Sequence, residues 1–162
     1  MNTSVKYGYS IYRRCFTGAN EYRYYHKEEL IGSATALIKY HYPVIINGDE
    51  RTFYCEHDLE LTLLPGCRKT IFSGNREYAE VIYLGRGQHC LIIGSNTIRI
   101  ITDKNAVCFY QNNILIATLC SAFAGSGGSG DWELRQTLFV LDEICHDYLL
   151  LLLSFPLLQI GI

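Results

Sequence analysis

The stretch "DEICHDYLLLLLSFPLLQIGI", residues 142–162, decides the fold of this 162-residue chain. Its leucines show neither the alternation of a strand nor a stripe along one side of a helix, so a helix formed here is apolar all round. Asp142 and Glu143 suit a helix N-terminus, where the backbone dipole favours carboxylates, and Pro156 ends or bends a helix. We therefore predict a helix over residues of about 142–154, roughly 20 Å long at 1.5 Å per residue.

An apolar helix is either a membrane span or a segment surrounded by protein. The uncharged stretch begins at Tyr148 and contains Pro156, so it is shorter than the roughly 20 residues that a span requires, and no basic cluster flanks it. We expect this helix to be enclosed by the protein, with no transmembrane span. A tail-anchored membrane protein is the alternative.

Short apolar runs alternate with turn clusters from Lys69 onward, which is typical of a β-meander. The turn clusters, which supply Gly or Asn where the backbone requires positive φ, are SGN (73–75), GRG (85–87), GSN (94–96), DKN (103–105) and QNN (111–113). The first half of the chain has a similar pattern, and the alternation in "WELRQTLFVL" (132–141) predicts a further strand near the end. The predicted total is about a dozen strands.

A helix can be enclosed only by a barrel of about eleven or twelve strands, because an eight-stranded barrel is filled by its own side chains. The sequence therefore predicts an all-β fold with one helix. The expected architecture is an antiparallel closed β-barrel of about 12 strands around a buried hydrophobic C-terminal helix. At 162 residues, the chain has the length of one domain, spanning 1–162.

The composition excludes several classes of protein. The formal net charge of −2 gives no general attraction to nucleic acid or anionic membrane, so polyanion binding would require a local patch. The seven cysteines are odd in number and form no C-x-x-C pair, which argues against a disulfide framework. The first residues, "MNTSVKYGYS", lack the apolar run of a signal peptide, and we expect a cytoplasmic protein whose membrane association would depend on a surface patch.

A barrel of about twelve strands around a very hydrophobic C-terminal helix resembles the tubby C-terminal domain superfamily, which includes LURP-one-related proteins and phospholipid scramblases. The resemblance is carried by the late meander, by "WELRQTLFVL", and by "DYLLLLLSFPLLQI" in the place of the family's buried helix. The chain is similar to small single-domain members found in bacteria. For function, the resemblance implies phosphoinositide-dependent tethering or lipid-associated roles. We do not expect scramblase activity, since the separate transmembrane span and Ca²⁺-binding segment are not recognised here.

The string "AGSGGSGDW", residues 124–132, contains the G-x-G-x-x-G spacing of a dinucleotide-binding turn at Gly125, Gly127 and Gly130. Such a turn requires a helix directly after it and an acidic residue about 20 positions on. The following residues alternate as a strand, and Leu150 occupies the acidic position. We therefore predict a flexible Gly/Ser loop over 124–131 and no cofactor.

Cys55 and His57 in "CEHD" would share one face of a strand about 7 Å apart, which is half of a metal or thiol site. No spacing elsewhere supplies further ligands. We expect no catalytic or metal-binding residues, and a small thiol or metal-dependent hydrolase that uses this pair is the second hypothesis.

Basic residues alternate with tyrosines between Lys6 and Lys27, with Glu21 as the single acid. The candidate anion-binding residues are Lys6, Arg13, Arg14, Arg23 and Lys27, with a second cluster of Arg68, Lys69 and Arg76. Basic and aromatic side chains together suit phosphate-rich partners, although a barrel wall of tyrosines with outward arginines gives the same pattern. We predict a non-enzymatic binding or regulatory domain that recognises anionic phospholipid headgroups, and we do not expect nucleic acid as a partner.

Overall fold

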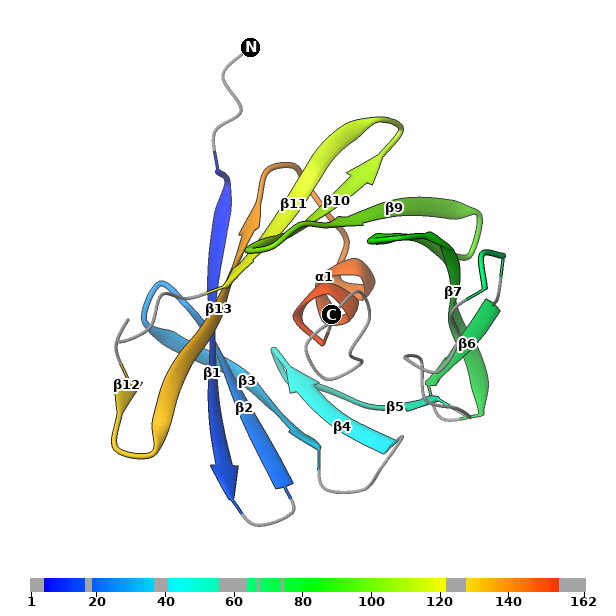
Figure 1. Ribbon diagram of the computed structural model, residues 1–162. Coiled ribbons are helices and arrows are strands. Elements are labelled where there is room, and N and C mark those ends of the chain that lie inside the picture. Colours follow the sequence, from blue (N-terminus) through cyan, green and yellow to red (C-terminus); the bar gives the residue numbers. More distant parts are fainter. Residues whose placement is uncertain are drawn as a thin grey trace.

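The computed structural model describes residues 5–16, 19–36, 41–55, 64–66, 68–73, 75–121 and 128–154. These residues form a closed antiparallel barrel of twelve strands with one short helix in its interior (Figure 1). The predicted fold class is confirmed.

The elements follow one another along the chain as a meander of strands that ends in the helix. The strands are β1 (Tyr7–Phe16), β2 (Ala19–His26), β3 (Glu29–Ala36), β4 (His41–Ile46), β5 (Asp49–Cys55), β6 (Arg68–Ser73), β7 (Arg76–Gly85), β8 (Gln88–Ile93), β9 (Asn96–Thr102), β10 (Ala106–Gln111), β11 (Ile114–Ser121), β12 (Gly128–Ser129) and β13 (Trp132–Val140), and the helix is α1 (His146–Leu153).

Strand β13 closes the barrel. Strands β1 to β11 pair in chain order, and β13 pairs with β11 on one side and with β1 on the other. Val140 of β13 thus lies opposite both Ala117 and Tyr7. The two-residue β12 pairs only with the start of β13 and is not a member of the ring. Because the ring is closed, each of its strands pairs with a neighbour on both sides.

Helix α1 is shorter than the sequence predicts, because it begins at His146 rather than near residue 142. Cys145 before it has an extended backbone, with φ −74° and ψ 163°, and the Asp142 carboxylate accepts a hydrogen bond from the neighbouring Glu143 N–H. These residues carry the chain from the barrel wall to its interior. Asp142 and Glu143 therefore lie in this connection and not in the first turn of the helix.

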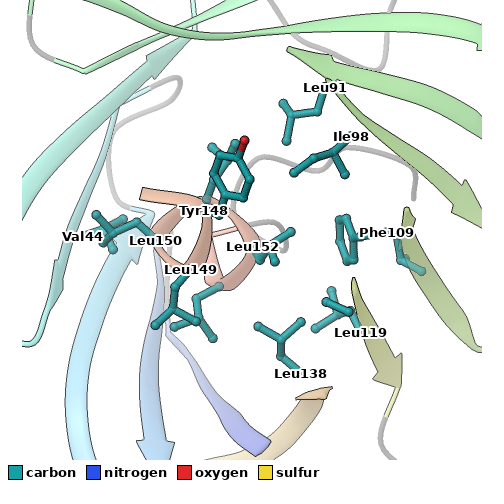
Figure 2. Close-up of a cluster of buried hydrophobic side chains, with 14 of the residues drawn as sticks. Val44, Leu91, Ile98, Phe109, Leu119, Leu138, Tyr148, Leu149, Leu150 and Leu152 are labelled. Atoms are coloured by element: carbon teal, nitrogen blue, oxygen red, sulfur yellow. The ribbon is translucent and has the colours of Figure 1, made fainter. Parts of the chain in front are cut away.

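All residues of α1 from Tyr148 to Leu153 are buried, which explains why the leucine run has no polar side. Figure 2 shows Leu150 on the side of the helix that faces Val44, and Leu152 on the side that faces Phe109. Ser154 after the helix is also buried, and its hydroxyl donates to the Leu150 carbonyl at 2.6 Å. The prediction of a helix surrounded by protein is confirmed. Among the residues that the structure describes, no helix has the length and hydrophobicity to cross a membrane.

Candidate functional site

The basic and tyrosine-rich stretch between Lys6 and Lys27 forms β1 and β2. The outward side chains of these two strands form one surface with those of the neighbouring β13. Ile11 and Tyr24 are fully buried, and because side chains alternate along a strand, their neighbours on β1 and β2 point outward. This surface, which we call the Trp132 face, comprises Tyr12, Arg14, Arg23, Tyr25 and Trp132.

Two guanidinium groups stack against the Trp132 indole. The guanidinium carbon of Arg23 lies 4.2 Å from the centroid of the Trp132 ring, and that of Arg14 lies 4.9 Å from it. Tyr12 and Tyr25 make an edge-to-face pair beside them, with centroids 5.3 Å apart. Each cation–π contact at such a site contributes about 0.5–1 kcal/mol and fixes the plane of the guanidinium.

The two arginines differ in their charge partners. Arg14 forms an ion pair with Glu21 at 2.9 Å, whereas Arg23 has no ion pair among the described residues. A guanidinium held by stacking keeps its N–H groups available for an anion. Arg23 is therefore the cation of this face best placed to receive an anionic ligand.

The other predicted cations do not join this face. Arg13 points to the opposite side of β1 and pairs with Glu133 at 2.8 Å, and Lys6 pairs with Glu143 at 3.6 Å. Lys27 is exposed in the turn between β2 and β3. Of the predicted group of five, only Arg14 and Arg23 therefore lie on the Trp132 face.

The second predicted cluster is also dispersed. Arg68 pairs with Glu80 at 2.7 Å, and Arg76 is exposed at the start of β7. The side chain of Lys69 lies outside the described residues.

Two further predictions concern segments that the structure describes only in part. His57 and the side chain of Cys55 lie outside the described residues, as do Gly125 and Gly127. Within the predicted loop, β12 and Gly130 form a tight hairpin with β13, and Gly130 has a φ of 63°. A strand therefore follows the glycine-rich string, as predicted, where a dinucleotide-binding turn would require a helix.

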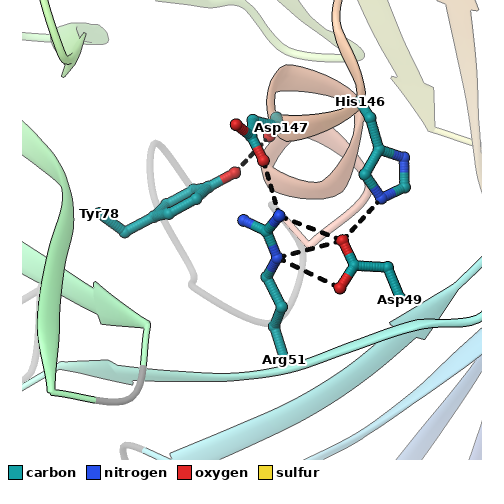
Figure 3. Close-up of polar contacts among 5 residues, drawn as sticks. All are labelled: Asp49, Arg51, Tyr78, His146 and Asp147. Atoms are coloured by element: carbon teal, nitrogen blue, oxygen red, sulfur yellow. Dashed lines mark hydrogen bonds and ion pairs between the residues drawn. The ribbon is translucent and has the colours of Figure 1, made fainter.

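A polar cluster joins the N-terminus of α1 to the barrel wall (Figure 3). We call it the helix clasp, and its members are Asp49 and Arg51 on β5, Tyr78 on β7, and His146 and Asp147 on α1. Arg51 bridges the Asp49 and Asp147 carboxylates at 3.1 and 2.8 Å. The His146 Nε2 atom lies 2.9 Å from the Asp49 carboxylate, and the Tyr78 hydroxyl donates to the Asp147 carbonyl at 2.6 Å.

The charges and hydrogen bonds of the helix clasp suit a structural anchor for α1 rather than a catalytic site. Burial raises the pKa of the Tyr78 phenol, so this group stays protonated and donates its hydrogen bond. The hydrogen bond from Arg51 lowers the pKa of Asp49, so this carboxylate stays charged between its two partners. Since these groups satisfy one another, the clasp fixes where α1 enters the barrel.

The stability of the protein should therefore depend on the charge of Asp49. A carboxyl whose pKa is lowered on folding contributes stability that is fully present above its unfolded pKa, about 3.9, and is lost as the pH falls through its folded pKa. We expect Asp49→Asn to melt below the wild type at neutral pH and the difference to shrink below about pH 4. Melting temperatures of both proteins from neutral to acidic pH test this, and parallel curves would contradict it.

Within the described residues, no group of three or more His, Cys, Asp or Glu side chains could hold a metal ion. Comparisons of the chain with protein-family models, with curated proteins and with solved structures find no match.

Proposed function

We propose that the barrel is a non-enzymatic binding domain of the cytoplasm that docks on anionic phospholipid headgroups through the Trp132 face. The observation that carries this proposal is the stacking of Arg14 and Arg23 on Trp132, with Arg23 unpaired among the described residues. The resemblance to tubby-like domains, several of which are tethered to lipid, agrees with such a role.

The chemistry of this face suits the boundary between headgroups and acyl chains. Tryptophan and tyrosine have an apolar body and a polar tip, which favours this boundary, and arginine donates paired hydrogen bonds to phosphate. Apolar side chains continue the face along the wall. Leu30 of β3 lies opposite Tyr25 and is 53% exposed, and Ile45 of β4 is 39% exposed.

The same face is less suited to single-stranded nucleic acid. Binding of that class requires aromatic rings onto which bases stack, together with a continuous basic groove. The Trp132 ring already stacks with two guanidinium groups, and the remaining predicted cations are paired or distant. A lipid surface needs only a small cationic patch with apolar neighbours.

Co-sedimentation with phosphatidylcholine vesicles, with and without phosphatidylserine, tests the proposal. Each basic side chain close to an anionic leaflet contributes about 1 kcal/mol, so Arg23→Glu should weaken binding by about 2 kcal/mol, or about thirtyfold. The wild type should sediment only with vesicles that contain phosphatidylserine, and added salt should release it.

Arg99→Glu is the matched control, because it makes the same charge change on β9, which β10 and β11 separate from β13 in the ring (Figure 1). We expect it to bind like the wild type. Equal recovery with neutral vesicles, or an equal loss in both variants, would refute the proposal.

A further inference from the structure

His89 lies on the inner face of the barrel wall, in β8. Residues directly opposite one another on paired strands share one face of the sheet. His89 lies opposite Ile100 of β9, which is fully buried, and opposite Tyr83 of β7, whose ring centroid is 5.3 Å from that of the imidazole. Thr102 is two residues beyond Ile100 on β9 and faces the same way. We call these four residues the His89 cluster.

The His89 imidazole has no neighbour in this cluster that stabilises its charged form. Its Nδ1 atom is buried without a hydrogen-bond partner among the described residues. Tyr83 is the titratable group that faces the ring from β7, and the side chains that face it from β9 are the uncharged Ile100 and Thr102. Arg99 precedes Ile100 and points to the opposite, outer face of β9. Burial therefore lowers the pKa of His89, and the ring is neutral at neutral pH.

A proton on His89 favours an open wall over the closed one. Both nitrogens of a protonated imidazole are donors, so the Nδ1–H would need an acceptor that the closed cluster does not offer. Water satisfies this donor once the wall opens. In the open state the imidazole takes up its proton near the ordinary pKa of about 6.5, whereas in the closed state this pKa is lower. The closed state is therefore fully favoured above about pH 6.5 and becomes less stable as the pH falls below this value.

The wall around His89 pairs irregularly and is distant from the helix clasp. The register of β7 with β8 shifts between Tyr83 and Gly85, and Gly85 and Gly87 have φ angles of 139° and 68°. Tyr83 follows the clasp residue Tyr78 by five residues, or about 16 Å along β7. Irregular pairing at the end of a strand favours local opening, which involves one hairpin rather than the whole fold.

We propose that His89 is a pH-sensitive switch in the barrel wall. When its imidazole takes up a proton, the hairpin of β7 and β8 separates from the end of β9 and exposes the apolar inner side of the barrel. Opening breaks the hydrogen bond from the Thr102 N–H to the Gly87 carbonyl, which is 2.7 Å long. The helix clasp stays closed in the same pH range, because a protonated His146 forms an ion pair with Asp49, 2.9 Å away. This switch does not involve the Trp132 face, since β9, β10 and β11 lie between β8 and β13 in the ring.

Hydrogen exchange measured by mass spectrometry at about pH 7.5 and about pH 5.5, on either side of the ordinary histidine pKa, tests this proposal. The rates are first corrected for the intrinsic pH dependence of exchange. In the wild type, the opening constant of residues 83–102 should then rise several-fold, and at most about tenfold, at the lower pH, since one proton is bound on opening. Peptides from β5 and α1 should keep their protection.

His89→Phe keeps an aromatic ring beside Tyr83 but cannot take up a proton, and His89→Asn replaces the ring with an uncharged amide. In both variants the opening constant of residues 83–102 should be the same at the two pH values. His41→Asn is the matched control, because it removes an exposed histidine on β4, and it should keep the response of the wild type. The switch would be overturned by a wild-type response that persists in both His89 variants, by an equal rise throughout the barrel, or by no rise in the wild type.

Discussion

Leu151→Asp should prevent the chain from folding. Leu151 lies in the middle of α1 and is 1% exposed, with barrel wall on every side of the helix (Figure 2). An unpaired carboxylate at such a position costs several kcal/mol, which is comparable to the total stability of about 5–15 kcal/mol for a domain. Far-UV circular dichroism and urea denaturation should show no cooperative unfolding transition in this variant.

Two variants separate the effect of burial from that of the aspartate. Ile114→Asp makes an equivalent change on β11, where the native side chain is 59% exposed, and this variant should fold. Leu151→Met keeps the volume and the hydrophobicity of the site and should lose less than about 1.5 kcal/mol. If Leu151→Asp unfolded cooperatively near the wild-type midpoint, the helix would not be the core of the barrel.

The fold was predictable because its two main signals are local. The leucine run of α1 lacks a polar side, and only a surrounding wall of protein or lipid accommodates such a helix. Turn residues such as Asn112 and Asn113 adopt positive φ, as their residue types suggest. The start of α1 was less predictable, since Asp142 suits a helix N-terminus as well as it suits the connection that it forms.

The candidate site was harder to predict from the sequence, because it depends on pairings between strands that are distant in the chain. Trp132 reaches Arg14 only because β13 pairs with β1, and the neighbouring contact of Arg13 with Glu133 joins positions 120 residues apart. The clasp between His146 and Asp49 spans 97 residues. One signal was present: strand alternation places Arg13 and Arg14 on opposite faces, so a single patch containing both was excluded by the sequence itself.

Gly32→Ala should cause a second large loss of stability, because β3 and β4 approach each other closely at this residue. A Cβ atom at Gly32 would lie 2.0 Å from the carbonyl oxygen of Ile45 and 2.9 Å from the Ile46 Cα atom. Both contacts are with backbone, which cannot move aside as a flexible side chain can. We expect a loss of about 3 kcal/mol or more, a fall of about 10 °C in the melting temperature of a domain of this size.

Gly8→Ala is the matched control, since Gly8 is also a strand glycine and a Cβ atom there would meet nothing within 4 Å. It should be neutral or slightly stabilising, because alanine restricts the unfolded chain more than glycine does. Equal losses of stability in the two variants would show that the close approach of β4 is not the reason why position 32 requires glycine. If only Gly32→Ala is destabilised, the reason lies in the ring itself: separating β3 from β4 opens the barrel and leaves two strand edges unpaired.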